Sequence, residues 1–154
     1  MKIALASDHA GYALKQAVSD YLSSRNTPFQ DFGCGPEDRV DYVDFAVKAI
    51  DGMKTHRCDR LILICGTGLG MAVVANKFRG IRATPCFDAY TAEMSRKHND
   101  SNCLTMGGRI LPVDEATEIV RVWLDLPFEA GRHAQRIAKI SDVEDRNFKS
   151  DEEA

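Results

Sequence analysis

The chain has 154 residues, of which 44% are hydrophobic and 28% charged, and its formal net charge is −3. These values are ordinary for a globular protein and favour neither a nucleic-acid-binding nor a membrane-binding surface. No apolar run approaches the roughly 18 residues of a membrane span, and the first residues lack the hydrophobic region of a signal peptide, so we expect a cytoplasmic protein.

Short apolar runs alternate with amphipathic segments along the chain, which predicts a parallel β-sheet covered by helices. The predicted strands are residues 2–7, 28–32, 60–64, 81–86 and 102–106. The predicted helices are 12–25, 42–55, 71–77, 89–97 and 113–124, with a last helix from 128 onward and a loop at 33–39. We expect one domain over 1–150, a three-layer αβα sandwich with five parallel strands of the flavodoxin-like or Rossmann-like type, and a polar tail at 151–154.

The apolar run 61–64 ends in a thiol and a glycine-rich turn, Cys65-Gly66-Thr67-Gly68-Leu69-Gly70. An apolar run without polar alternation indicates a strand buried on both faces, so the turn is expected at the carboxyl edge of the sheet, where α/β proteins bind ligands. The helix predicted next favours a thiolate at Cys65 through its dipole. Cysteine alone is more often a buried hydrophobic residue, but the Thr67 hydroxyl and the backbone N–H donors of the turn favour a chemical role.

Further reactive side chains are expected at the same edge. Asp8 and His9 follow the first predicted strand, His98 and Asn99 precede the fifth, and Arg109 follows the fifth. Together with Cys65 and Thr67 they form a catalytic constellation rather than a packing pattern. Two simpler roles stay open, since Asp8-His9 is also a suitable N-cap for the first helix, and His98 suits the negative end of the helix 89–97.

Arg132 and Arg136 lie four residues apart in the last predicted helix, where like charges repel. A dianionic phosphate would remove this repulsion, and the planar guanidinium group suits phosphate oxygens. The alternative is a solvated helix face partly neutralised by Glu129. Because an anion-binding turn is predicted elsewhere in the chain, we interpret the pair as a phosphate clamp.

The sequence predicts neither a metal nor a cofactor. The five cysteines include no CxxC pair and the four histidines no HExxH or HxH spacing, which argues against zinc sites and against a disulfide framework. The glycine turn is not the GxGxxG dinucleotide motif, because Met71 occupies the position of its third glycine. A Walker lysine motif is also missing, so nucleoside triphosphates are not expected.

A series of short segments then carries a family resemblance. In chain order they are Ser7-Asp8-His9-Ala10-Gly11, Asp41-Tyr42, the turn 65–70, Ala75-Asn76-Lys77, Gly80-Ile81-Arg82-Ala83, Ser95-Arg96, His98-Asn99-Asp100 and Gly131-Arg132-His133. Over nearly the whole chain the sequence resembles the ribose-5-phosphate isomerase B family, which also includes allose-6-phosphate and galactose-6-phosphate isomerases.

The resemblance implies a metal-independent aldose–ketose isomerase of sugar phosphates that works through an enediolate. By similarity, His98 helps to open the furanose ring with the assistance of Asp8, and Cys65 moves the proton between C1 and C2. Thr67 and the N–H groups of the turn, on Gly66, Gly68, Leu69 and Gly70, are expected to stabilise the enediolate oxygen.

The resemblance also implies a homodimer or homotetramer whose sites lie between subunits. His98, Asn99 and Arg109 are therefore expected to serve the Cys65 of a neighbour, and a monomer is expected to be inactive. The implied phosphate ligands are His9, Arg132 and Arg136, and the implied contacts to sugar hydroxyls or phosphate are Tyr42, Asn99 and Arg109.

Three departures from the family pattern affect the expected substrate. Met71 stands where one branch of the family has a glutamate base, which leaves Cys65 as the obvious base. Val43 replaces the usual proline, and Gly108 the usual alanine, near the sugar end of the site. Ribose 5-phosphate is the expected substrate, and the alternatives are an allose, galactose or tetrose phosphate, or a non-catalytic sugar-phosphate-binding module.

Overall fold

The structure is a computed structural model that describes residues 1–35, 38–55 and 57–148. The predicted tail 151–154, the end of the predicted domain and positions 36–37 of the predicted loop lie outside the described residues. The strands are β1 (Ile3–Ser7), β2 (Phe29–Asp31), β3 (Arg60–Cys65), β4 (Ala83–Pro85) and β5 (Cys103–Gly107). The helices are a 3-10 turn η1 (His9–Gly11), α1 (Tyr12–Ser24), α2 (Tyr42–Thr55), α3 (Leu69–Ala75), α4 (Ala89–Lys97), α5 (Val113–Asp125) and α6 (Arg132–Asn147).

The five strands form one parallel sheet in the order β2-β1-β3-β5-β4. This confirms the predicted α/β fold with a five-stranded parallel sheet. The order differs from the flavodoxin order 2-1-3-4-5 by the exchange of the last two strands. The chain adds strands on one side of β1 and then on the other, so the topological switch point lies between β1 and β3, where α/β proteins bind ligands.

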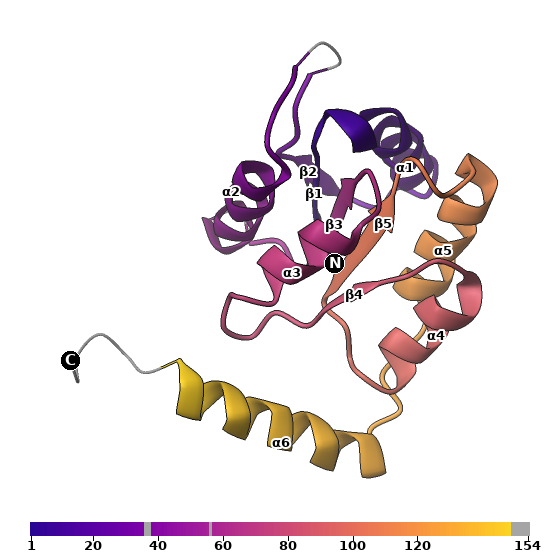
Figure 1. Cartoon of the computed structure of the whole chain (residues 1–154). Helices are drawn as coiled ribbons and strands as arrows, with labels where there is room; N and C mark the ends of the chain where they lie inside the picture. Colours follow the sequence, from indigo (N-terminus) through magenta and orange to yellow (C-terminus); the bar gives the residue numbers. More distant parts are fainter. Residues whose placement is uncertain (36–37, 56, 149–154) are drawn as a thin grey trace.

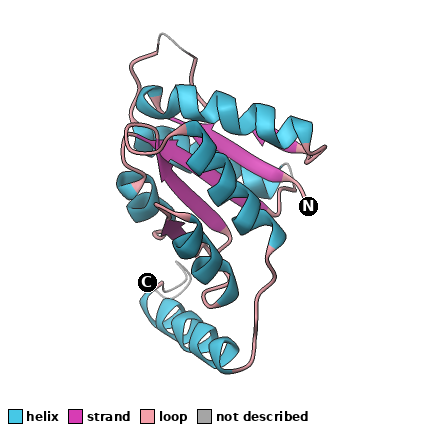
Figure 2. Cartoon of the chain, turned by 90° about the vertical axis from the view of Figure 1, so that its right-hand side faces the viewer, coloured by secondary structure: helices cyan, strands magenta, loops and turns pink. Residues whose placement is uncertain are grey.

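Helices cover both faces of the sheet, as Figures 1 and 2 show. Helices α1, α4 and α5 pack on one face, where Ile62 and Ile64 point, and α2 and α3 pack on the other, where Leu61 and Leu63 point. All four side chains of this run are fully buried. The unbroken apolar pattern of β3 is thus explained by burial on both faces. Within the described part of the chain, no helix combines the length and the apolar character needed to cross a membrane.

Two predicted helix starts were wrong. Helix α3 begins at Leu69 rather than at residue 71, because Gly68, with φ +81°, forms its N-cap. Helix α6 begins at Arg132 rather than at 128, because Ala130 and Gly131 both have left-handed backbone angles, at φ 55° and φ 54°. Residues in that conformation do not continue a right-handed helix.

Helix α6 lies apart from the two helical layers, along the lower side of the molecule in Figure 1. Its far end contacts the segment after α3, where Arg79 pairs with Asp145 at 2.5 Å and the Gly80 N–H donates to Glu144 Oε1 at 2.8 Å. Within α6 only His133 is buried. Ile140 and Val143 are about half exposed, at 49% and 48%. The apolar side of this helix is therefore largely uncovered in the isolated chain.

Candidate active site

A cleft of about 480 Å³ opens at the switch point, at the carboxyl ends of β1 and β3. Its walls come from the segments that follow β1, β3 and β5 and from the starts of α2 and α3. The lining residues are Asp8, His9, Ala10, Tyr42, Cys65, Gly66, Thr67, Gly70 and Arg109. The structure thus brings the predicted thiol, hydroxyl and carboxylate together with one imidazole, one arginine and one tyrosine.

Cys65 ends β3 and is 5% exposed. Its Sγ atom accepts the Gly68 N–H at 3.2 Å, and the Thr67 Oγ1 atom accepts the Leu69 N–H at 3.3 Å. Gly68 can only be glycine, because its φ is +81° and a Cβ there would lie 2.9 Å from the Met106 carbonyl carbon. The sequence therefore folds a tight turn against the end of β5, and this turn directs the Gly68 N–H at the cysteine sulfur.

Tyr42, the first residue of α2, lies over the glycine turn. A Cβ built on Gly70 would lie 2.7 Å from Tyr42 Cε2, so the glycine makes room for the ring. The start of α2 is fixed by Asp41, whose Oδ1 accepts the Val43 N–H at 2.9 Å. Tyr42 therefore lines the cleft from a helix start with a defined backbone.

Asp8 and His9 lie at the end of β1. Asp8 is buried, and its Oδ1 accepts the Gly11 N–H at 2.9 Å, so it caps η1 rather than α1 itself. His9 is exposed on the cleft wall, with its Nδ1 atom 3.2 Å from the Val40 carbonyl oxygen. Asp8 is thus an N-cap, but of the 3-10 turn that precedes the first predicted helix and not of that helix itself, and this role is compatible with a role in the cleft.

Arg109 follows β5 and lies in the cleft of its own chain. Its backbone N–H donates to the Gly66 carbonyl at 3.1 Å, and its side chain runs past Gly66, within 3.4 Å of a Cβ built there. The expectation that Arg109 serves a neighbour's cysteine is therefore wrong. The loop after β5 ends at the same sheet edge as Cys65, because the two strands are paired in parallel register, Cys65 opposite Gly107.

His98 and Asn99 lie at the amino ends of the strands, opposite to Cys65. This contradicts the prediction that all these side chains share the carboxyl edge of the sheet. They precede β5, whose first residue Cys103 pairs with Leu61 near the start of β3. A segment that precedes a parallel strand lies at its amino end, whereas Cys65 lies at the carboxyl end. His98 is the C-cap of α4, and its N–H donates to the Met94 carbonyl at 2.9 Å, so the capping alternative is realised.

Asn99 belongs to a turn held by two arginines. Asp100 has a left-handed backbone, with φ 45°, and its carboxylate pairs with Arg82 Nη2 and Arg96 Nη1, each at 3.0 Å. Arg82 Nε also donates to the Asn99 carbonyl at 3.2 Å. Sequence reasoning noted these arginines only as parts of motifs. In the structure they fix the backbone that presents His98 and Asn99.

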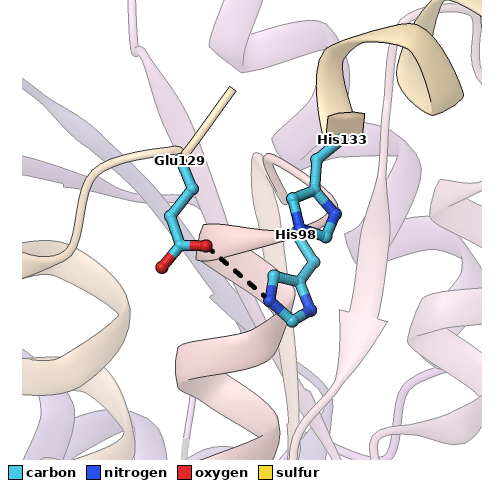
Figure 3. Close-up of side chains that lie close together, drawn as sticks. All are labelled: His98, Glu129 and His133. Atoms are coloured by element: carbon cyan, nitrogen blue, oxygen red, sulfur yellow. Dashed lines mark ion pairs between the residues drawn. The ribbon is translucent and has the colours of Figure 1, made fainter. Parts of the chain in front are cut away.

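Figure 3 shows a contact that the sequence did not predict, in which His133 from the start of α6 stacks on His98. The ring centroids are 4.1 Å apart and the planes are 5° from parallel. Glu129 Oε2 lies 3.9 Å from His98 Nε2. Burial lowers the pKa of His133, and the charges of His98, Arg132 and Arg136 lower it further. The only signal in the sequence was the position of His133 beside Arg132.

The side-chain ligand atoms of His98, Glu129 and His133 lie within 4.8 Å of one another, a spacing that a bound metal requires. The surroundings oppose a cation, however. Arg132 Nε donates to His133 Nε2 at 3.4 Å, and Arg136 adds a second positive charge near that ring. We therefore assign no metal to this cluster, and its charge suits an anion better.

Each chain thus carries two separate groups of predicted site residues. The thiol half-site is the cleft around Cys65. The imidazole half-site consists of His98, Asn99, Arg132 and Arg136, at the end of α4 and the start of α6. Asn99 also borders a second cleft, of about 440 Å³, between α6 and the region of β4. None of these four residues lines the cleft of Cys65 in the same chain.

Comparisons with known proteins agree on one family. The family model described as Ribose/Galactose Isomerase matches residues 3–140. The chain is 41% identical to ribose-5-phosphate isomerase B of Escherichia coli over 94% of this chain and 97% of that protein. It is 38% identical to D-erythrulose-4-phosphate isomerase of Pectobacterium atrosepticum, over 91% of this chain and 93% of that protein. A solved structure of Clostridium thermocellum ribose-5-phosphate isomerase B superposes with a TM-score of 0.91 at 47% identity, covering 95% of this chain and 99% of that one.

Proposed function

The chain belongs to the Ribose/Galactose Isomerase family and is a sugar-phosphate isomerase, and we propose that it interconverts ribose 5-phosphate and ribulose 5-phosphate. The observation that carries this proposal is the position of Cys65, which ends a central strand at the switch point and accepts the Gly68 N–H. Two similar proteins bear the name ribose-5-phosphate isomerase B, which supports the pentose phosphate as substrate.

In the proposed reaction, the Cys65 thiolate removes the proton from C2 of the open-chain aldose phosphate. The electron pair of that C–H bond becomes the C1–C2 double bond of the enediolate, and the carbonyl oxygen at C1 takes the negative charge. The thiol then returns its proton to C1, while the hydroxyl proton at O2 moves to O1 and leaves the ketone at C2. The reaction is balanced with no oxidant and no cofactor.

The glycine turn is suited to hold the charge of the enediolate. Thr67 contributes a hydroxyl, and the first N–H groups of α3 have no acceptor within the helix. Each such donor is typically worth about 3 kcal/mol in the transition state when it is already in place. Gly68 fixes the geometry of these donors before substrate arrives, which is the condition for this contribution.

The imidazole half-site is proposed to act on the thiol half-site of a second copy. In one chain, His98 and Cys65 lie at opposite sheet edges, so a ring-opening His98 can reach a bound sugar only from another subunit. In a dimer, His98 and Asn99 would then contact the sugar, and Arg132 and Arg136 would join His9 around the phosphate. A two-fold axis that brings the imidazole half-site of one chain to the thiol half-site of its partner also brings the partner's imidazole half-site to the first thiol half-site, so a dimer has two complete sites.

Uncovered apolar surface supports this assembly. Leu69 and Val73 are spaced one helical turn apart on α3, beside the cleft, and are 51% and 63% exposed. Helix α6, which carries the two arginines, is also uncovered along most of its length. Apolar surface next to a functional cleft is typical of an interface between subunits.

The assigned chemistry also bears on the cellular compartment of the enzyme and on whether it needs a metal. A catalytic thiol must stay reduced, which places the enzyme in a reducing compartment such as the cytoplasm. Every group assigned a role is an amino-acid side chain or a backbone N–H, so we expect EDTA to leave activity unchanged. A loss of activity on chelation that returns with added metal would contradict this part of the proposal.

Incubation of the purified protein with a panel of phosphosugars tests the proposal. We expect ribose 5-phosphate to be converted with a higher kcat/KM than allose 6-phosphate, galactose 6-phosphate or erythrulose 4-phosphate. A tetrose phosphate is the second candidate substrate, because the Pectobacterium relative is named for one and because Val43 and Gly108 replace the residues usual in the family near the sugar. A preference for that sugar would overturn the assigned substrate, and binding without turnover of any sugar would show a non-catalytic binding module.

A further inference from the structure

The ring of His133 lies flat against the ring of His98, with centroids 4.1 Å apart (Figure 3). His133 is 6% exposed, whereas the His98 side chain is 35% exposed. Rotation of the His98 ring out of this plane would drive it into a buried neighbour, and close-packed surroundings resist such a movement. The contact therefore restricts the orientation of the imidazole that is proposed to open the sugar ring.

A strained backbone turn brings His133 to this position. Ala130 adopts a left-handed conformation, which is unfavourable for alanine, and Gly131 follows with a positive φ. The Glu129 N–H donates to the Lys97 carbonyl at 3.1 Å, and the His133 N–H donates to the Ala130 carbonyl at 3.0 Å. The first bond ties the loop before α6 to the end of α4, and the second closes the turn from which α6 starts. Strain of this kind persists where the surrounding structure holds it, often at functional sites.

The charge state of His133 suits a supporting role. Its Nε2 atom accepts the Arg132 Nε–H at 3.4 Å, which assigns the ring proton to Nδ1 and leaves the ring neutral. The groups that face it are Arg132 and Arg136 on α6, His98 at the end of α4, and Glu129 in the loop between α5 and α6. Burial lowers the pKa of His133, and the three cationic or titratable neighbours act in the same direction, whereas Glu129 opposes them. A neutral ring stacks on His98 without repulsion when His98 carries a proton.

Glu129 supports the same side chain from its edge. Its Oε2 atom lies 3.9 Å from His98 Nε2, while its Oε1 atom lies 3.5 Å from Lys97 Nζ. Lys97 is in turn paired with Glu93 at 2.7 Å. The carboxylate is thus held at one edge of the His98 ring while His133 covers one face. The His98 side chain keeps 35% of its surface exposed, where a ligand can reach it.

We propose that His133 is a positioning residue for His98, whose buried neutral ring holds the plane of the His98 imidazole for ring opening and does not itself touch substrate. The inference rests on the proposed function, because it assumes that His98 acts on the sugar. It predicts that a flat ring of another kind can replace His133, whereas a small side chain cannot.

Three variants test this: His133→Ala, His133→Phe and, as a control on the exposed side of the same helix, Gln135→Ala. With ribose 5-phosphate as substrate, we expect His133→Ala to lower kcat by about tenfold to a hundredfold, as for a misplaced catalytic group, with KM within about twofold of the unchanged protein. His133→Phe should restore most of the lost kcat, and Gln135→Ala should have no effect. A His133→Ala enzyme with full kcat, or a defect in KM alone, would overturn the proposal, the second because it would indicate a substrate contact.

A second measurement does not depend on activity, and its decisive result comes from the unchanged protein. In the unchanged protein, the ring current of His133 should move the proton NMR signal of the His98 Cε1–H upfield from its position in free histidine. His133→Phe should keep the upfield shift and His133→Ala should remove it. An unshifted His98 signal in the unchanged protein would overturn the inference. If no phosphosugar is converted while the upfield shift is present, the proposed function fails and the stacking itself stands.

Discussion

Cys65 lies at the carboxyl ends of the strands of one parallel sheet and His98 at their amino ends, although both side chains are assigned to the same reaction. Cys65 ends β3, whereas His98 precedes β5, and the two strands run parallel with Leu61 opposite Cys103. No rotation of either side chain can bring them together across the length of a strand. A shared site therefore requires two copies of the chain.

Cys65→Ser should lower kcat by about a thousandfold or more, because the active base is the thiolate and a serine hydroxyl does not ionise near neutral pH to replace it. The substitution is nearly isosteric, so binding of ribose 5-phosphate should change little. Steady-state kinetics and isothermal titration calorimetry measure the two effects. The matched control is Cys86→Ala, a buried cysteine outside the cleft, which should keep its activity. Full turnover by Cys65→Ser would refute the assignment of the base.

Alkylation of the native protein should modify Cys65 before the other cysteines. Burial raises the pKa of Cys34, Cys58, Cys86 and Cys103, which keeps these thiols protonated and unreactive. Cys65 lines the open cleft and accepts an N–H bond at its sulfur. Peptide mapping by mass spectrometry after a short treatment with iodoacetamide at neutral pH gives the order of modification. The assignment of Cys65 as the reactive thiol would be contradicted if Cys34 were modified faster. It would also be contradicted if ribose 5-phosphate protected a cysteine other than Cys65.

Gly68→Ala should destabilise the protein more than Gly80→Ala. Both glycines have a positive φ, +81° and +78°, so both variants carry the strain of a left-handed alanine, about 1 to 2 kcal/mol. Only Gly68 also places the new Cβ against backbone, 2.9 Å from the Met106 carbonyl carbon, whereas a Cβ on Gly80 meets nothing within 4 Å. Denaturant unfolding measures the difference. Equal losses for the two variants would show that the turn does not pack against β5 as described.

As the pH falls, the unchanged protein should lose stability more steeply than the His133→Phe variant does. The folded pKa of His133 lies below its unfolded value, by burial and then by the nearby His98, Arg132 and Arg136. Between the two pKa values the unfolded chain binds more protons than the folded chain. The contribution of neutral His133 to the free energy of unfolding is therefore complete above about pH 6.5 and is lost as the pH falls through the folded pKa. Melting temperatures from pH 7.5 to pH 5 measure it. A parallel decline in both proteins would contradict the lowered pKa.

Sequence patterns predicted the fold well because the signals that define it are local. The apolar run 61–64 and the amphipathic periodicity of 42–55 identify a buried strand and a helix without reference to the rest of the chain. The order of β4 and β5 in the sheet, and the start of α6 after Ala130 and Gly131, depend on tertiary structure instead. Alanine gives no local sign of a left-handed backbone, so the prediction for the last helix started too early.

Several residues that the sequence singled out line one cleft, but the position of His98 and Asn99 was predicted wrongly. Loops after strands met at one edge as expected, which placed Asp8, Cys65 and Arg109 in one cleft. The error concerned His98, because a segment before a strand was assigned to the same edge as segments after strands. The stacking of His133 on His98 could not be predicted, since it joins the end of α4 to the start of α6 through a turn that only the folded chain defines.

Mixing two inactive variants tests the shared site most directly. Cys65→Ser and His98→Asn homodimers should each lack activity, because every site contains the altered residue. When equal amounts are unfolded and refolded together, half of the dimers are mixed, and each mixed dimer has one site with both residues intact and one with neither. The mixture should therefore have about one quarter of the activity of the unchanged protein. If the mixture stays inactive although native mass spectrometry detects mixed dimers, Cys65 and His98 do not serve one site across subunits.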